Sequence, residues 1–505
     1  MDPIGMNSYN VSNLLRIGGL ATGLDTDSIV KQLMKVASLP LDKLNQQKQW
    51  YQWQQEDLRD INAKLMNLRN NVVASLRLQG TFMAKTVTSS NPSVATATAG
   101  ANAVNGTYTL SVTQLASAPT YVATPVASLI NNTGVDVTLT LNGQSLIIKN
   151  NATISDVVNA INSLTPKTSV SATYDSTLNK LFLISNKTGA QSTISLTASD
   201  VNGQTVLSNL GLPTNGININ GSDAIFTFNG VQITSSTNNV TVAGINVTLI
   251  GTTASGQNIT LTVSTDVDKI YNTIKNFVDT YNDVITQMYT KLTEKRYYDY
   301  PPLTDEQKQA MKENDIKLWE EKARSGNLAN DETLMRAYYS LRQAVSSTVS
   351  GVGSLSSIGI TTGQWYEGGK LYIDEAKLKD AIANNLDKVM QIFTGVYSSD
   401  GTTLLSPGIA QQLYGYFENG TFKEGVLGTA INAITRKAGS STQLYDNSFI
   451  GNRIREIDDR IAEMQKRLKD LEDRYYRQFT QLEIFVGQMN TQSAWLNQQI
   501  GIMTK

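Results

Sequence analysis

Apolar residues recur at heptad spacing near the start of the chain and predict a long helix there. Ser38-Leu39-Pro40 is read as its start, because Ser suits the N-cap and Pro suits the first turn. A shorter helix is expected just ahead of it, with Asp27 as its cap. The seam of the long helix runs over about four heptads and consists of Leu44, Tyr51, Leu58, Leu65 and Val72, with Ile61 and Leu68 at the second seam position.

Two further heptad runs lie in the second half of the chain. One begins at Val267 and ends before Pro301-Pro302, after which Thr304 and Gln307 resemble a capping box. The last run is the clearest, because its apolar steps alternate by three and four over many turns and predict one long packed helix. Its apolar positions are Ile454, Ile457, Ile461, Met464, Leu468, Leu471, Tyr475, Leu482, Phe485, Met489 and Leu496.

Between these helical regions the period changes from helical to alternating. Val137, Leu139 and Leu141 alternate with polar residues, as in a strand with one buried face. The dipeptides at 142–143 and 229–230 are both Asn-Gly, which is a strong signal for a two-residue hairpin turn. One short amphipathic helix is expected after Thr153, which forms a capping box with Asp156.

Composition limits the chemistry that the chain can perform. The 505 residues include no Cys and no His, which excludes thiolate nucleophiles, imidazole acid–base chemistry and the usual zinc sites. The formal net charge is -1, so nothing attracts the chain to nucleic acid or to an anionic membrane. No transmembrane stretch and no secretory signal peptide are apparent, and no cofactor or metal is expected.

The heptad runs lie at opposite ends of the chain and can pack together only if the ends meet. The sequence therefore predicts an α+β multidomain protein, in which terminal coiled-coil or helical-bundle legs carry inserted β-rich head domains. The predicted domains are a terminal leg (1–45 and 440–505), a helical bundle stalk (46–85 and 266–439), a β-rich head (86–125 and 220–265) and a second inserted head with a short helix (126–219).

A thin helical bundle cannot cover all of its own apolar stripes, so partner helices from other copies are expected. The alternative, in which the same residues form an intramolecular core, stays open. The residues predicted to pack the legs are Leu44, Leu58, Ile61, Leu65 and Leu68, with Ile457, Ile461, Met464, Leu468 and Leu471 as their partners.

Several short motifs carry a resemblance to a known family. Residues 17–34 read IGGLATGLDTDSIVKQLM and are followed by Pro40-Leu41-Asp42-Lys43-Leu44. Together with Phe277 to Asn282, Gly369 to Glu375 and the last helix, they resemble the family of flagellar hook-associated protein 2, the filament-capping proteins. Residues 141–164 resemble a small repeat shared with some flagellins, and residues 300–328 resemble an insert found in part of the family.

This resemblance implies a function and a location. Members of the family are exported unfolded, assemble as a ring that is commonly a pentamer, and cap the filament tip outside the cell. The ring is expected to promote the folding and insertion of exported flagellin. The implied partners are a second copy of the chain, flagellin, the hook–filament junction proteins and an export chaperone. Neither nucleic acid nor membrane insertion is implied.

Two other functional classes remain as alternatives. The Ser-, Thr- and Asn-rich heads suggest a surface adhesin for host glycans. An enzyme with paired carboxylates is disfavoured, because Asp458-Asp459 and Glu320-Glu321 lie in charge-rich helices that are typical of solvated faces. The segment from Gly363 to Lys370 resembles a phosphate loop, but Gln364 stands where its first Gly is required and Leu371 follows Lys370 in place of Ser or Thr, so a turn is expected there.

Overall fold

The computed structural model describes residues 22–418, 420–440 and 445–503. Its contacts divide the chain into two units. Unit 1 contains residues 1–78, 273–381 and 385–505, and unit 2 contains residues 79–272 and 382–384. The α+β class predicted from the sequence is confirmed, whereas the finer boundaries of the four predicted domains stay a prediction.

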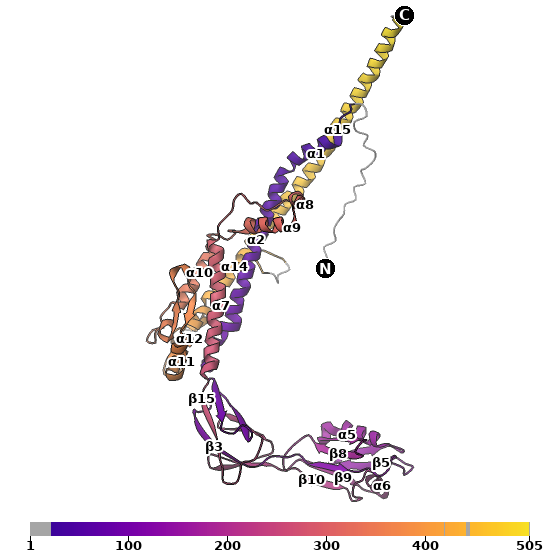
Figure 1. The fold of residues 1–505 in the computed structure, drawn as a ribbon, viewed down its shortest axis with the longest axis vertical. Helices are drawn as coiled ribbons and strands as arrows, with labels where there is room; N and C mark the ends of the chain where they lie inside the picture. The colour runs from indigo at the N-terminus through magenta and orange to yellow at the C-terminus, as the bar shows by residue number, and fades with distance from the viewer. Residues whose placement is uncertain (1–21, 419, 441–444, 504–505) are drawn as a thin grey trace. The chain divides into compact units, whose positions relative to one another are not determined.

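Unit 1 is built mainly from helices (Figure 1). These helices bury apolar stripes against one another. In the longer helices each stripe recurs at helical spacing, so one face of the helix contributes to the core. Its helices are α1 (Thr26–Ala37), α2 (Leu39–Asn67), the π-helix η1 (Leu68–Val73), α3 (Ala74–Leu76), α7 (Val267–Thr293, shared with unit 2), α8 (Asp305–Ala310), α9 (Glu313–Arg324), α10 (Glu332–Val345), η2 (Leu355–Ile358), η3 (Trp365–Glu367), α11 (Glu375–Asn384, ending in unit 2), α12 (Leu386–Thr394), α13 (Ile409–Tyr414), α14 (Val426–Ala438) and α15 (Phe449–Met503).

Three small antiparallel pairs complete unit 1. They are β16 (Ile360–Thr362) with β17 (Leu371–Ile373), β18 (Val396–Tyr397) with β19 (Leu404–Ser406), and β20 (Gly415–Glu418) with β21 (Thr421–Glu424).

The caps of the first two helices differ from those predicted. Asp25, not Asp27, caps α1, because its carboxylate accepts the Ser28 backbone N–H at 3.0 Å. Ser38 makes no capping hydrogen bond to α2 and instead donates its hydroxyl to the Lys35 carbonyl. The backbone at Ser38 keeps helical angles, so α1 and α2 follow one another without the extended residue that a side-chain cap needs. By contrast, the predicted box of Thr304 and Gln307 is confirmed at α8.

Unit 2 contains two separate apolar cores, each covered by β-sheets. The first core lies between a sheet of order β1-β15-β3-β11-β12 and a sheet of order β13-β14-β2. Their strands are β1 (Lys85–Ser89), β2 (Ala95–Ala99), β3 (Gly106–Gln114), β11 (Ala224–Phe228), β12 (Val231–Ser235), β13 (Asn239–Val242), β14 (Ile245–Leu249) and β15 (Ile259–Thr265). The unit also begins with the short helix α4 (Gln79–Phe82).

The buried residues of the second core of unit 2 all lie in the range 123–217. Its sheets have the orders β10-β9-β5-β6 and β4-β8-β7, and two helices pack on them. These elements are β4 (Thr120–Ala123), β5 (Val137–Leu141), β6 (Gln144–Ile148), α5 (Ile154–Thr168), β7 (Val170–Asp175), β8 (Lys180–Ser185), β9 (Thr193–Ala198), α6 (Val201–Asn209) and β10 (Ile217–Asn220).

The two hairpin turns and the capping box predicted for unit 2 are present in the structure. Leu141 pairs with Gln144 across the turn at 142–143, and Asn142 and Gly143 have φ values of 47° and 78°. Both residues of a type I′ turn need positive φ, which Asn and Gly adopt at the least cost. The same geometry recurs at Asn229-Gly230, and the capping box of Thr153 with Asp156 opens α5.

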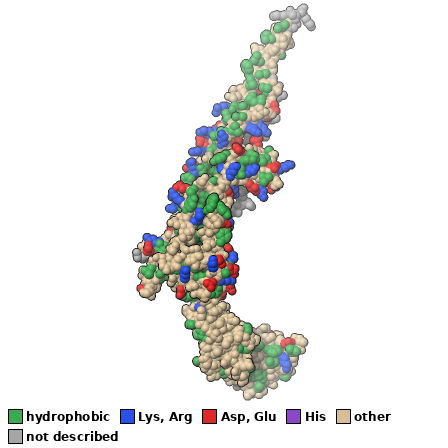
Figure 2. Space-filling model, turned by 60° about the vertical axis from the view of Figure 1, so that its left-hand side comes forward, with side chains coloured by type: hydrophobic (Ala, Val, Ile, Leu, Met, Phe, Trp, Pro, Cys, Tyr) green, Lys and Arg blue, Asp and Glu red, His purple; other side chains and the backbone are tan. Residues whose placement is uncertain are grey.

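Charge is distributed unequally between the two units. No Glu and no Arg occurs between residues 79 and 272. Figure 2 accordingly shows blue and red side chains gathered on unit 1, while the visible face of unit 2 is mainly tan. The stability of unit 2 therefore depends on apolar packing and hydrogen bonds more than on ion pairs.

Truncating a core side chain of unit 2 tests this dependence. Leu139 is fully buried in the second core, so Leu139→Ala should cost about 2–5 kcal/mol of local stability. Native-state amide exchange of α5 measures this cost. Ile147 on the paired strand is 53% exposed, so Ile147→Ala should change the same exchange by less than about 0.5 kcal/mol. Equal effects of the two variants would contradict the assigned core.

Candidate functional site

The N-terminal residues predicted to pack the legs belong largely to the core of unit 1. Leu58, Ile61, Leu65 and Leu68 are all buried, whereas Leu44 is half-buried. The helix α2 packs along α14 and α15, and η1, which carries Leu68, continues it directly. The four buried side chains are therefore covered within one chain and offer no surface to a second copy.

Polar contacts fix the register between α2 and α15. Lys48 forms an ion pair of 2.6 Å with Asp458, and Arg59 forms one of 2.8 Å with Asp446, just before α15 begins. Moving forward along α2 thus means moving backward toward the start of α15, so the two helices run antiparallel. Thr22, ahead of α1, continues this register by hydrogen-bonding Glu483 through its N–H and its hydroxyl.

This register shows which members of the two residue groups come together within one chain. Leu44 lies four residues before Lys48 and so comes to the level of Ile461. Ile61, Leu65 and Leu68 follow Arg59, which already meets Asp446, so they lie beyond the start of α15 and cannot pair with its seam. Heptad spacing identified the apolar faces correctly, but it carries no information on which heptads lie opposite one another.

The predicted partners on α15 differ in how well one chain covers them. Ile457 is buried, whereas Ile461, Met464, Leu468 and Leu471 are half-buried. The antiparallel register brings this part of α15 to the first turns of α2 and to α1, which contacts α15 as well. Whether these half-buried side chains also pack against a second copy stays a prediction.

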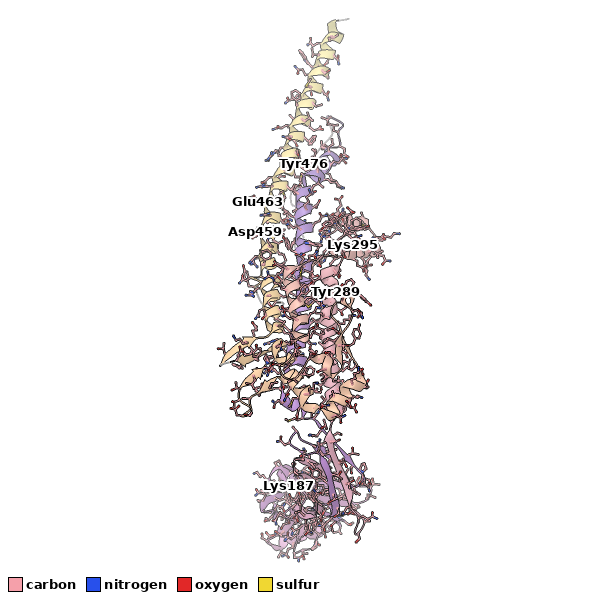
Figure 3. The ribbon with its side chains drawn as sticks, turned by 90° about the vertical axis from the view of Figure 1, so that its left-hand side faces the viewer. Lys187, Tyr289, Lys295, Asp459, Glu463 and Tyr476 are labelled. Atoms are coloured by element: carbon pink, nitrogen blue, oxygen red, sulfur yellow. The ribbon has the colours of Figure 1, made fainter. Side chains whose placement is uncertain are left out.

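The distal part of α15 presents an apolar stripe to solvent. Leu482, Phe485, Met489 and Leu496 continue the heptad phase and are 42%, 59%, 54% and 48% exposed. Every side chain from 488 to 500 is exposed. Figure 3 shows Asp459, Glu463 and Tyr476 in this order along α15, with the helix continuing beyond Tyr476. We call residues 482–500 the distal stripe; three further exposed apolar side chains belong to it, namely Ile484, Trp495 and Ile500.

Such a stripe is unfavourable in water and favours association. Burying one large apolar side chain contributes about 1.5–3 kcal/mol, so the four heptad residues together offer a substantial driving force. Exposed apolar patches of this kind mark interaction surfaces. The charged residues of α15 lie mostly earlier in the helix, between residues 453 and 477, and the distal stripe itself contains no Lys, Arg or Asp and a single Glu at 483.

An ionic cluster that the sequence did not reveal joins α2 to α7 and to the insert at residues 300–328. Asp57 is only 7% exposed. Its carboxylate accepts hydrogen bonds from Arg324 at 2.5 Å and from Asn327 at 2.7 Å. It also forms an ion pair with Lys291 at 3.0 Å. Gln54 adds a hydrogen bond from its amide to the Asn327 carbonyl at 2.7 Å. Asp57 and Arg324 are 267 residues apart in sequence, so no spacing rule connects them.

The cluster keeps Asp57 ionised despite its burial. Burial by itself raises the pKa of Asp57, but the hydrogen bonds from Arg324 and Asn327 and the charge of Lys291 outweigh it, so the pKa is lowered overall. A carboxyl whose pKa is lower in the folded than in the unfolded state stabilises the fold above its unfolded pKa. That contribution is lost as the pH falls through the folded value.

Removing the charge of Asp57 tests this cluster. Asp57→Asn deprives two cations of their buried partner and should cost about 3–5 kcal/mol at pH 7. The difference from the unaltered chain should shrink as the pH falls below about 4, where Asp57 itself becomes protonated. Urea unfolding of both proteins at pH 7 and at a pH below about 4 measures this difference in the free energy of unfolding.

Asp283→Asn is the matched control for this experiment. Asp283 pairs with Lys64 at 3.0 Å, but its side chain is 63% exposed, so its loss should cost less than about 1 kcal/mol at either pH. A pH-independent cost for Asp57→Asn would show that the residue acts through shape rather than charge.

The remaining chemical motifs do not form a reactive centre. Asp458 is paired with Lys48 and Glu320 with Lys308, as expected of solvated helix faces. The segment resembling a phosphate loop is a turn, confirmed by the left-handed backbone of Gly368 and Gly369. Within residues 22–418, 420–440 and 445–503, no group of three or more acidic side chains is placed to hold a metal ion. In the same ranges, no helix is both long and apolar enough to cross a membrane.

Comparison with known proteins places the chain in a family. The family description "Flagellar hook-associated protein 2 C-terminus" matches residues 221–491, and the corresponding N-terminal description matches residues 22–119. A "Flagellin hook IN motif" matches residues 136–187, which enclose much of the second core of unit 2.

Individual relatives agree over nearly the whole chain. A flagellar hook-associated protein 2 from Halalkalibacterium halodurans is 32% identical, covering 96% of this chain and 99% of its own length. One from Thermotoga maritima is 24% identical, covering 98% of each. The crystal structure of the D1-D2-D3 domains of the flagellar cap protein FliD from Escherichia coli aligns with a TM-score of 0.53 at 24% identity, covering 80% of this chain and 99% of that one.

These matches define a class of flagellar structural proteins with helical and β-rich parts. The chain belongs to the flagellar hook-associated protein 2 family. Membership of this family confirms that the chain is a structural protein of the flagellum rather than an enzyme.

Proposed function

We propose that the chain caps the tip of the flagellar filament as a ring of identical copies. The observation that carries this proposal is the distal stripe, an apolar surface that continues a packed heptad seam beyond the partners that residues 22–418, 420–440 and 445–503 provide. The Escherichia coli relative that shares the fold is a flagellar cap protein, which supports the same role here. The location that follows is outside the cell, at the end of the flagellum.

The ring holds exported flagellin where it folds and is inserted beneath the cap. In this proposal the distal stripes of neighbouring copies pack on one another and on the filament end. A coiled-coil seam is suited to this work, because its apolar positions exchange one partner helix for an equivalent one without changing the buried area. A ring of five, the export chaperone and the hook–filament junction proteins belong to the same proposal.

The adhesin alternative has weaker support. Unit 2 does expose hydroxyl and amide side chains, such as Thr107 and Thr262, whose hydroxyls lie 3.4 Å apart. Nothing else about these side chains points to a carbohydrate, so glycan binding stays a prediction. A glycan array probed with the full-length chain tests it. Glycan binding that is lost when residues of unit 2 are exchanged would establish the adhesin function.

A paired substitution tests the cap proposal. Phe485→Asp with Met489→Asp places two charges in the distal stripe, where burial requires their desolvation, so ring formation and capping should both be lost. Electron microscopy of the purified protein shows the rings, and motility or filament length reports capping.

The matched control is Asn490→Asp with Asn497→Asp, two exposed positions of the same segment on the helix face away from the heptad residues and from Ile484 and Trp495. This variant should form rings and cap filaments. Both variants should keep the amide exchange of unit 1 unchanged upstream of residue 477, since the stripe itself is solvated in a single copy. If the variant with Phe485→Asp and Met489→Asp forms as many rings as the unaltered protein, the distal stripe is not the assembly surface.

A further inference from the structure

Helix α10 lies between two surface cavities that open on its opposite faces. The larger one, of about 690 Å³, is lined by α10 together with α14 and the β20–β21 hairpin. The smaller one, of about 280 Å³, is lined by α10, α7 and Trp365 of η3. At 3.6 residues per turn, positions 333, 336, 337 and 340 face the first cavity and positions 335, 338, 339 and 342 face the second, nearly opposite side.

Two aromatic rings project from the turn beside the smaller cavity. Trp365 is 82% exposed and Tyr366 is 60% exposed, with their ring centroids 5.8 Å apart in an edge-on arrangement. Neighbouring aromatic rings left in water indicate an interaction surface, because each removes about 150–250 Å² from water when it is buried. We call Trp365 and Tyr366 the aromatic knob.

Hydrogen bonds hold the turn that carries the knob. Tyr338, on α10, donates its hydroxyl to the Gly368 carbonyl at 2.9 Å. Glu367 accepts from the Gln364 N–H at 2.6 Å and from the Tyr372 hydroxyl at 2.5 Å. An aromatic pair on a turn fixed in this way loses little entropy on binding, which suits a recognition element.

The same turn fits closely against the helices beneath it. A side chain at Gly368 would lie 2.7 Å from the ring of Tyr289 on α7, a residue labelled in Figure 3. The φ of Gly368 is also +68°, a backbone conformation that residues with a side chain seldom adopt. Both constraints keep the knob in one position relative to α7 and α10.

The larger cavity has a shape and a charge that complement the knob; we call it the α10–α14 groove. Small side chains line it, among them Ala337, Ala430 and Ala433, and leave room for a bulky ring. Arg436 is a further lining residue and carries a positive charge.

The other charges of the groove are compensated within the chain. Arg336 pairs with Glu332, and Lys423 lies 3.9 Å from Glu418. The Asn432 side-chain amide donates to Glu424 at 2.7 Å. Among the described residues that line the groove, Arg436 is therefore the cation that is available to an anion from outside.

The carboxylate of Glu367 lies beside the knob. The Tyr372 hydroxyl and the Gln364 N–H lower the pKa of Glu367, so its carboxylate is ionised at neutral pH. Glu367 follows Tyr366 directly in the chain. The knob thus combines two apolar rings with one negative charge, and the groove combines an alanine-lined space with one positive charge.

We infer that the aromatic knob of one copy of this chain inserts into the α10–α14 groove of the next copy, with Glu367 beside Arg436. This inference rests on the proposed ring and deepens it by naming the contact. A ring requires two different surfaces on each chain that fit one another, and opposite sides of α10 adjoin them. A second copy of the chain is the occupant of the groove, because it supplies both the aromatic side chains and the carboxylate that the groove complements.

The size of the contact fits a central anchor rather than a whole interface. Two aromatic side chains bury roughly 300–500 Å² of the knob's surface, whereas a stable interface buries about 1,200–2,000 Å² in total. The knob therefore supplies a hot spot, in which a large ring fills a pocket and charged groups around the rim exclude water. The distal stripes provide the additional area in the same assembly.

Cross-linking of two single-cysteine variants tests this contact, because the chain contains no Cys of its own. Tyr366→Cys lies on the knob, and Thr429→Cys lies at the exposed edge of the groove. A short bis-maleimide should join the two variants when they are mixed under conditions of ring assembly, and should join neither variant to itself. Rings that form in the mixture without a cross-link, or cross-linking of one variant to itself, would each overturn the inference.

Removal of the knob gives an independent measure. Trp365→Ala should weaken self-association at least tenfold, Trp365→Phe should weaken it less, and Tyr298→Ala, a control on another ring that is 85% exposed, should change it less than twofold. Sedimentation at a series of concentrations measures the association, and unchanged thermal unfolding shows that the variants are folded. If Trp365→Ala associates as tightly as the Tyr298→Ala control, the knob is not an anchor.

The two proposals can fail separately. Unaltered protein that forms rings and caps filaments, but shows no mixed cross-link between the two cysteine variants, refutes the knob and leaves the cap function standing. Unaltered protein that forms no rings at all refutes the proposed function itself.

Discussion

The antiparallel packing of α2 on α15 is the interaction on which the rest of this structure depends. Ion pairs of Lys48 with Asp458 and of Arg59 with Asp446 set its register, and apolar side chains of both helices fill the seam between them. At a rise of 1.5 Å per residue, the 55 residues of α15 extend for about 80 Å. The partners α2 and α1 accompany only the first part, as far as Glu483, which hydrogen-bonds Thr22. Among the residues that the structure describes, α15 is longer than its partners, so the seam of its distal part is uncovered there, and this unequal length accounts for a surface that favours association.

The ionic cluster around Asp57 has a related role inside unit 1. It joins α2 and α7 to the segment that contains Arg324 and Asn327, and each of these partners of Asp57 comes from outside α2. A buried ion pair stabilises little compared with apolar packing, but its directional hydrogen bonds define one arrangement of the segments that share it. The residues that carry α10, the aromatic knob and the α10–α14 groove follow this segment in the chain, so its placement bears on theirs.

Much of the fold followed from the sequence because the signals are local. The Asn-Gly turns at 142–143 and 229–230, the capping box of Thr153 and the heptad phase of α15 each involve residues within one turn or one helix. Local signals could not show which distant residues meet. Leu65 and Leu468 both lie on apolar seams, yet the register of α2 on α15 keeps them apart, because heptad spacing fixes a face and not a register. Asp57 and the knob at Trp365 were missed for the same reason, since their importance depends on long-range neighbours. The local signal for the knob was only two adjacent aromatic residues in a Gly-rich turn.

Amide hydrogen exchange of residues 482–500 tests the central claim most directly, because it reports on the distal stripe in the unaltered chain. In dilute protein these amides should exchange rapidly, as expected of a helix whose apolar side has no partner. In the assembled protein they should become strongly protected, while amides of unit 2 exchange as before. Equally slow exchange of residues 482–500 in dilute and in assembled protein would contradict the account, because the helix would then be stable without a neighbour.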